Sequence, residues 1–128
     1  MASMRCAAWP DVRIVGLTYF DVILANYLSP EQSQRTLAEL SVIAFKGIIN
    51  PALKRAYAAG GASFVDITRA SGAYTPLSQT VQTPLGTLPV AVAKVCELTW
   101  MCERRDIHPR TNGYRLMAER IAAALPRR

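Results

Sequence analysis

The chain contains one histidine, His108, with an acid two residues before it and a proline directly after it. A neutral imidazole takes up protons near neutral pH and is the commonest general base. A carboxylate beside it fixes its tautomer and stabilises the charged ring. Asp106 and His108 are therefore the candidate acid–base pair. A histidine beside an acid is also commonly a surface residue with a satisfied hydrogen bond, and this second interpretation stays open.

A loop followed by a helix is predicted to position this pair. Pro109 fixes its own φ and disfavours helical geometry at His108, which places the histidine in a loop. We expect Asn112 to cap the helix that follows. The apolar residues of that helix recur at helical spacing and would anchor the loop to a core: Leu116, Met117, Ile121, Ala124 and Leu125.

Residues 106–118 (DIHPRTNGYRLMA) resemble the last conserved block of the SGNH, or GDSL-type, hydrolases. Three earlier segments resemble other parts of that family in the same order: residues 11–21 a central strand, 49–66 the helix and strand before the catalytic loop, and 95–102 (VCELTWMC) a segment of the exported actinobacterial branch. The resemblance runs from about residue 10 to residue 126. It implies a three-layer α/β/α, flavodoxin-like fold, present as its C-terminal portion and forming a single domain over residues 1–128.

The activity that this resemblance implies is carboxylic-ester hydrolysis by an esterase or lipase, with small-molecule acyl esters or lipids as substrates and with no cofactor or metal. His108 would be the base, and Asp106 would orient its ring. Many family members place the acid three residues before the histidine, where this chain has Arg105; other branches use the spacing of Asp106. Tyr74 and Trp100 are candidate substrate-binding residues.

The family's nucleophile block, Gly-Asp-Ser, and its oxyanion donors have no counterpart in the sequence. None of the seven serines lies in a Gly-Asp-Ser or Gly-x-Ser-x-Gly context. We therefore expect the C-terminal half of such an enzyme, nearly inactive alone because the nucleophile is absent, with the N-terminal half as its partner. The alternative is a non-catalytic remnant or interaction module that associates through an exposed apolar edge.

The cysteines bear on the compartment. Cys96 and Cys102 enclose five residues directly before the histidine loop, and a disulfide between them would suit an exported protein. Two alternatives are a pair of reduced thiols and a zinc site that includes Asp106 and His108, although the tight Cys-x-x-Cys spacing of zinc sites is missing. Residues 1–9 lack the long apolar core of a signal peptide, so secretion is expected only of the parent protein.

Charge and hydropathy limit the partners. The net charge is +6, and the segment from Arg104 onward has seven arginines against two acids. A basic cluster binds nucleic acid by releasing counterions, but no interleaved aromatic residues or binding motif accompany this one, so we expect no nucleic-acid partner. No apolar run approaches the roughly 20 residues of a membrane span, so none is expected.

The remaining pattern alternates between strands and helices. Residues 12–19 and 62–67 are predicted strands, and Asp66 is expected to cap the next turn or, alternatively, to point into an active-site crevice. A helix capped by Ser29 is predicted to break or kink at Asn50 because Pro51 lacks an amide, then to continue to residue 59. Its aliphatic face is expected in the core: Leu37, Leu40, Ala44 and Ile48.

Residues 71–89 are rich in Gly, Pro, Ser, Thr and Gln and are predicted to form a long loop. Such a loop is a candidate lid or binding segment. Four of its residues could line an apolar acyl pocket or, equally, only anchor the loop to the core: Tyr74, Leu77, Val81 and Leu85. Residues 90–98 are predicted to form a short helix that leads to the histidine loop.

Overall fold

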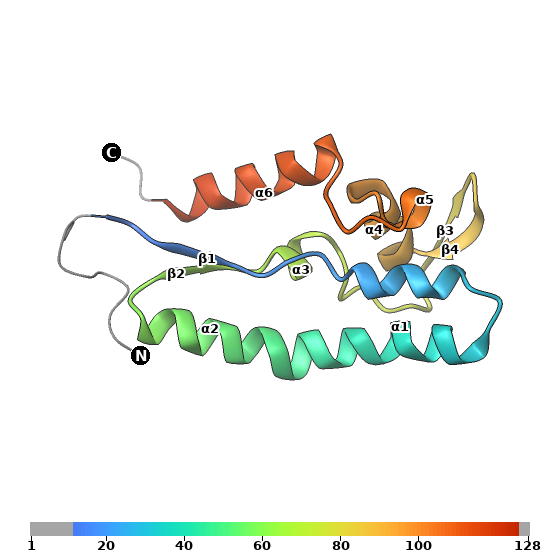
Figure 1. The fold of residues 1–128 in the computed structure, drawn as a ribbon, viewed down its shortest axis with the longest axis horizontal. Coiled ribbons are helices and arrows are strands. Elements are labelled where there is room, and N and C mark those ends of the chain that lie inside the picture. Colours follow the sequence, from blue (N-terminus) through green and yellow to red (C-terminus); the bar gives the residue numbers. More distant parts are fainter. Residues whose placement is uncertain (1–11, 126–128) are drawn as a thin grey trace.

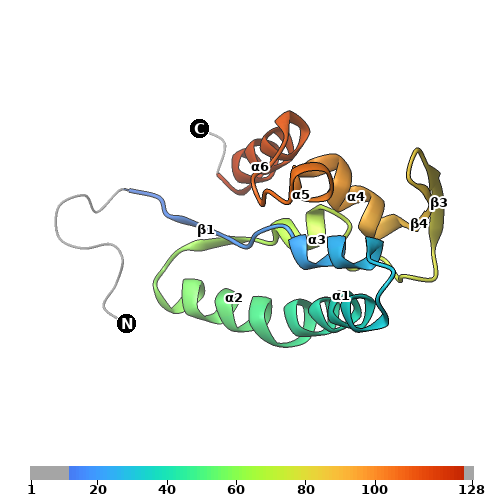
Figure 2. The ribbon, with the colours of Figure 1, turned by 45° about the vertical axis from the view of Figure 1, so that its right-hand side comes forward.

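A parallel pair of short strands lies at the centre, with helices on both sides of it (Figures 1 and 2). The computed structural model describes residues 12–125. Strands β1 (Val15–Leu17) and β2 (Ser63–Val65) pair in register, with Gly16 opposite Phe64. Both strands are shorter than their predicted ranges. Within the described residues the architecture is mixed α/β, with two two-stranded sheets and six α-helices.

Helix α2 (Asn50–Ala59) covers one side of the strand pair and helix α6 (Thr111–Ala124) the other (Figure 1). Gly16 explains how closely α2 approaches β1. A Cβ at Gly16 would lie 2.4 Å from the ring of Tyr57, so only glycine leaves room for that ring. The Tyr57 hydroxyl also donates a hydrogen bond to the carbonyl of Leu17 at 3.4 Å, which ties the helix to the strand.

The long helix is continuous through the point where the sequence predicted a break or kink. Helix α1 (Gln32–Ala44) passes into α2 through a π-helical segment, η2 (Phe45–Ile49). The amide of Asn50 bonds back to the carbonyl of Phe45, and this wider turn lets Pro51 enter the helix without an amide of its own. The N-cap position is Glu31 rather than Ser29, whose hydroxyl accepts a bond from the Glu31 amide at 3.2 Å.

The aliphatic face predicted for the core lies mostly on the outside. Ala38 and Ser41 face inward and are buried. Leu37, Leu40 and Ile48 are exposed, and Ile43 beside them is 64% exposed. The prediction failed because α1 has apolar residues on two faces, and the smaller ones, which allow a close approach, are the buried ones. We call the exposed set the outer stripe: Leu37, Leu40, Ile43 and Ile48.

The continuous helix Gln32–Ala59 has 28 residues and a mean hydropathy of 1.3 over its most apolar window. Its length and composition are those of a helix able to cross a membrane. A single such helix is weak evidence, because core helices of water-soluble proteins pass the same test. The expectation of no membrane span therefore stays a prediction.

A β-hairpin replaces most of the predicted long loop. Strands β3 (Thr80–Thr83) and β4 (Gly86–Pro89) pair antiparallel around a turn at residues 84–85. Gly86 has φ of +102°, a backbone conformation that favours glycine. Thr80, Val81 and Thr83 are β-branched residues, a strand signal that the abundance of Gly and Pro obscured.

Two groups of buried side chains form the core. The first joins the 3-10 segment η1 (Val22–Leu28) to helix α4 (Val90–Leu98), whose bounds match the predicted helix. The second lies under α6 and includes Val65 and Ile67, the latter at the start of the short helix α3 (Ile67–Ala70). Val22 packs against both groups and so links them.

Candidate functional site

The histidine loop connects helix α5 (Met101–Arg104) to helix α6. Arg105 ends α5 in the left-handed conformation with φ of 52°. Beyond it, Thr99 and Pro109 form an isolated antiparallel bridge, with the Trp100 amide donating to the His108 carbonyl at 3.0 Å. The loop is therefore held by backbone bonds beside His108, as a catalytic side chain requires.

Helix α6 anchors the loop through Gly113. A Cβ at Gly113 would lie 2.2 Å from the carbonyl oxygen of Leu98 and 2.8 Å from the Pro109 side chain, so glycine permits α6 to rest on the end of α4. The predicted cap is wrong: Arg110 holds the N-cap position, and Asn112 lies inside the first turn. Leu116, Met117 and Ala124 pack against the second core group as predicted, whereas Leu125 follows the helix as its C-cap and is 40% exposed.

Asp106 and His108 form the predicted pair. The ring Nδ1 of His108 lies 2.5 Å from Oδ1 of Asp106, and the His108 amide donates to the same oxygen at 2.9 Å. The hydrogen bond from the His108 backbone amide, and after it the hydrogen bond with the ring, lowers the pKa of Asp106 below its ordinary value. With the carboxylate ionised, this bond takes its proton from Nδ1, and in the neutral form of the ring Nε2 is then the acceptor. The His108 side chain is 69% exposed.

Tyr19 connects the loop to the strand side of the fold. Its hydroxyl donates a hydrogen bond to the carbonyl of Ile107 at 2.8 Å. Burial raises the pKa of Tyr19, and the nearby Tyr114 and Asp106 raise it further, so the phenol stays neutral and remains a donor. The sequence did not predict this support.

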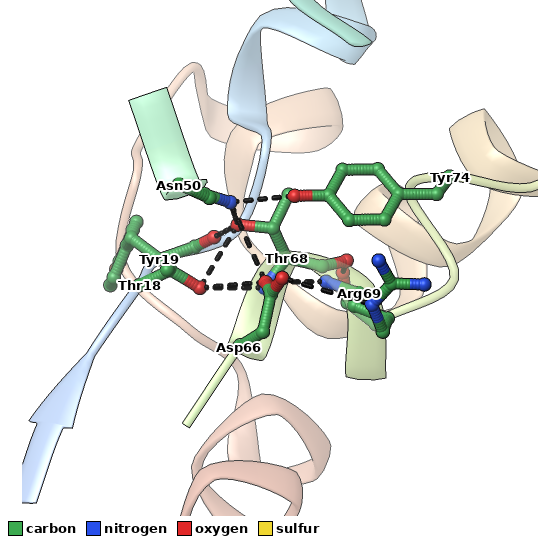
Figure 3. A network of polar contacts seen from close by, with 8 residues as sticks. Thr18, Tyr19, Asn50, Asp66, Thr68, Arg69 and Tyr74 are labelled. Atoms are coloured by element: carbon green, nitrogen blue, oxygen red, sulfur yellow. Dashed lines mark hydrogen bonds and ion pairs between the residues drawn. The ribbon is translucent and has the colours of Figure 1, made fainter. Parts of the chain in front are cut away.

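A polar network follows the carboxyl ends of β1 and β2 (Figure 3). The buried amide of Asn50 donates to Thr68 Oγ1 at 2.8 Å and to the Tyr74 hydroxyl at 2.7 Å. Thr68 in turn donates to the carbonyl of Tyr19 at 2.6 Å. The network thus joins α2 and α3 to the residue that supports the histidine loop. Sequence reasoning missed Asn50 and Thr68, because a buried amide and hydroxyl give no periodic signal.

Asp66 belongs to this network as a helix cap. Its Oδ1 accepts the amide of Arg69 at 2.9 Å, which caps α3, and the Thr18 hydroxyl at 3.1 Å. The capping interpretation is therefore confirmed. Tyr74 also lies in this network, with the Arg69 guanidinium 5.1 Å from its ring centre and its pKa raised by burial. Its predicted role in binding substrate stays a prediction.

Trp100 lies beside the histidine loop, and two arginines stack on its ring. The guanidinium carbons of Arg104 and Arg110 lie 3.8 and 4.1 Å from the ring centre, which are cation–π contacts. Arg110 is held further by Glu103 at 2.8 Å. The predicted role of Trp100 in binding substrate stays a prediction.

The predicted disulfide is present. Cys96 and Cys102 are bonded, with 5.1 Å between their Cα atoms, and they join α4 to α5 directly before the histidine loop. The alternative of two reduced thiols is therefore wrong for this structure. Because both sulfurs are in the disulfide, neither is present as the thiolate ligand that the zinc alternative required.

A groove of about 850 Å³ opens between the hairpin and α4. Val81 and Leu85 line it, as predicted for an apolar pocket, whereas Tyr74 and Leu77 are not among its lining residues. Arg110 and Cys102, which flank the histidine loop, also line it. His108 is not part of this lining.

Asp21 is a buried acid next to α1. Only 1% of the residue is exposed, Ser41 donates to its Oδ2 at 2.8 Å, and Oδ1 has no partner within the described part of the chain. Burial raises the pKa of Asp21, and the bond from Ser41 lowers it in part. Asp21 is therefore part of the packed interior rather than of an open site.

No protein-family model, curated protein or solved structure matches this chain. The resemblance to the SGNH hydrolases rests on the sequence segments, and the site rests on its own geometry.

Proposed function

We propose that Asp106 and His108 are the acid–base half of a serine ester-hydrolase site, carried by the C-terminal portion of a three-layer SGNH hydrolase fold. The single observation that supports this most strongly is the 2.5 Å contact between His108 Nδ1 and Asp106 Oδ1 on an exposed ring. This contact directs Nε2 outward as a proton acceptor, which is the form that a general base needs.

The proposed reaction is acyl transfer to serine followed by hydrolysis. His108 Nε2 takes the serine proton as the serine oxygen attacks the ester carbonyl, and Asp106 stabilises the imidazolium. The same proton then goes to the leaving alcohol as the carbon–oxygen bond of the ester breaks. Water repeats the two steps on the acyl-serine and releases the acid.

The nucleophile must come from outside the described residues. None of the serines in residues 12–125 is hydrogen-bonded to His108; Ser41 bonds to Asp21, and Ser71 bonds to the carbonyl of Thr68. The proposed partner is the N-terminal half of such a hydrolase, which would bring both the serine and the oxyanion donors. The chain alone is then expected to be nearly inactive, because the nucleophile contributes several orders of magnitude to turnover.

The disulfide supports secretion of the parent protein. Disulfides persist in oxidising compartments outside the cytosol, and the bond between Cys96 and Cys102 fixes the element that precedes the histidine loop. An exported esterase or lipase acting on acyl esters is the proposal that agrees with both the bond and the resemblance.

A non-catalytic interaction module is the second candidate. The observation in its favour is the outer stripe, since exposed aliphatic side chains that lie together on one helix commonly mark a contact surface. The high exposure of His108 also agrees with an ordinary surface histidine.

Hydrolysis of p-nitrophenyl butyrate distinguishes the two candidates. The chain would be tested alone and fused behind the N-terminal half of an SGNH hydrolase that carries the Gly-Asp-Ser block. We expect no saturable turnover from the chain alone and clear turnover from the fusion. His108→Ala in the fusion should lower kcat by roughly 1,000-fold or more, and Asp106→Asn should lower it strongly as well.

Two results would count against the proposal. A folded fusion with no turnover would favour the interaction module. Saturable turnover by the chain alone that is lost in His108→Ala would mean that this chain holds its own nucleophile. Ser63 and Ser71 would then be the first serines to replace.

A further inference from the structure

We propose that the groove between the β3–β4 hairpin and helix α4 binds a neutral hydrocarbon chain. Its volume of about 850 Å³ lies within the range of roughly 300–1,000 Å³ that small-molecule sites occupy. Its walls are largely aliphatic, with two exposed side chains on the hairpin and three further apolar side chains from β4 and α4: Val81, Leu85, Leu88, Val90 and Ala93.

The charges around the groove favour an uncharged ligand. Lys94 pairs with Glu97 at 2.8 Å, and Arg110 pairs with Glu103 at 2.8 Å. Each cation in the lining is therefore matched by a carboxylate, and neither is free to hold an anionic head group. A hydrocarbon chain complements this lining, because it removes water from the aliphatic walls and demands no charged partner.

The groove is built before any ligand arrives. The disulfide between Cys96 and Cys102 forms part of one wall and links α4 to α5. The hairpin is closed by the Thr83 hydroxyl, which donates to the Gly86 carbonyl at 2.8 Å, and by the contact of the Gln82 amide with Thr87 at 2.7 Å. Because the wall is already formed, little conformational entropy is lost on binding, and this favours affinity for a simple apolar ligand.

The position of the groove suggests which kind of molecule the bound hydrocarbon would be part of. Arg110 lines the groove and lies two residues after His108 in the same pinned loop. Assigning the hydrocarbon as the acyl or alkyl part of an ester rests on the proposed function. The binding of the hydrocarbon does not, so the two can fail separately.

Binding of 1-dodecanol to the full chain tests the inference. Displacement of the neutral dye Nile red gives the affinity, and amide shifts in a ¹H–¹⁵N NMR spectrum give the location. We expect saturable binding, with shifts in β3, β4 and α4. Leu85→Asp should weaken binding by about 10-fold or more, because it places a charge in the apolar wall.

Ile43→Asp is the matched control. Leu85 is 62% exposed and Ile43 is 64% exposed, so neither substitution removes a core side chain, but Ile43 lies on the outer stripe away from the groove. We expect Ile43→Asp to leave the affinity for 1-dodecanol unchanged. Dodecanoate should bind no tighter than 1-dodecanol, because the cations of the groove are paired.

The inference would be overturned by any of three results: no saturable displacement, equal affinity in Leu85→Asp, or loss of binding in Ile43→Asp with shifts along α1. Dodecanoate binding more than about 10-fold tighter than 1-dodecanol would contradict the neutral-ligand assignment. None of these measurements depends on hydrolysis, so an inactive fusion would leave this result unaffected.

Discussion

The hydrogen bonds of Asp106 set its ionisation. Its pKa is lowered first by the His108 amide and then by the ring, so His108→Ala removes the second cause and keeps the first. We expect the pKa of Asp106 to rise in this variant only part of the way to its ordinary value. The titration of its carboxyl carbon by ¹³C NMR measures the change, with Arg104→Gln as a control because Arg104 is the weakest cause.

The same hydrogen bonds determine in which direction the folding stability of the protein changes with pH. An acid with a depressed pKa in the folded state contributes stability above its unfolded pKa, and this contribution is lost as the pH falls through the folded pKa. A pKa of Asp106 that stays the same in His108→Ala would mean that the ring is not bonded to the carboxylate, which would remove the main support for a catalytic pair.

The contribution of Asp21 to folding stability should depend on pH in the opposite direction. Burial raises its pKa, so between the unfolded and folded pKa values the folded state holds more protons, and stability falls as the pH rises through that window. Asp21→Asn should therefore be the more stable protein at pH 8, by about 1.4 kcal/mol per pKa unit of the shift. Urea unfolding at pH 4 and pH 8 measures this.

Ser41→Ala provides the second arm of this test. The hydroxyl of Ser41 lowers the pKa of Asp21 by donating to Oδ2, so its removal should steepen the loss of stability with rising pH. Parallel stability curves for Asp21→Asn and the unmodified chain would show that the buried carboxyl does not titrate in this range.

At the scale of elements, Gly113 controls the contact between α6 and α4. We expect Gly113→Ala to destabilise the protein by about 1–3 kcal/mol, because the new methyl group meets the Leu98 carbonyl. It should also shift the His108 ring signals, since the loop rests on the same contact. Thermal unfolding by circular dichroism and the NMR signals of the single histidine measure the two effects.

Gly47 is the matched control because it lies in the continuous helix with no heavy atom within 4 Å of an added Cβ. Gly47→Ala should stabilise the protein by up to about 1 kcal/mol through helix propensity. If Gly113→Ala stabilised the protein by a similar amount, the close contact with Leu98 would be wrong.

Elements were predictable where a local signal dominated. The helix Val90–Leu98, the end of the long helix at Gly60 and the loop around His108 all follow from short-range pattern and backbone geometry. The hairpin was missed because its Gly and Pro are turn residues. The cap was wrongly placed at Asn112 because the helix begins earlier, at Thr111, with Arg110 in the N-cap position.

Tertiary contacts decided what the sequence could not. Whether Leu40 or Ala38 faces inward depends on how closely α1 approaches η1, and the periodicity of a doubly apolar helix does not reveal that. In the site, the pair of Asp106 and His108 came from residue types two positions apart. The support from Tyr19 comes from a residue 88 positions away and required the fold.

At the scale of the whole molecule, the two core groups share Val22, so we expect them to unfold together. In a Trp9→Phe background, Trp100 fluorescence reports on the histidine side, while far-UV circular dichroism reports on all helices. The two urea transitions should coincide. Separate midpoints would show that α6 and the histidine loop unfold independently of the long helix.

The continuous helix Gln32–Ala59 also determines how the molecule moves in solution. Its 28 residues extend about 40 Å at 1.5 Å per residue, and Figure 1 shows β1, β2 and α6 running along it. A compact folded domain of this length has a radius of gyration of roughly 14 Å, so a helix of about 40 Å spans its full width. Because the N–H bonds of the helix lie along its axis, its amides should show faster transverse ¹⁵N relaxation than amides whose bonds lie across that axis.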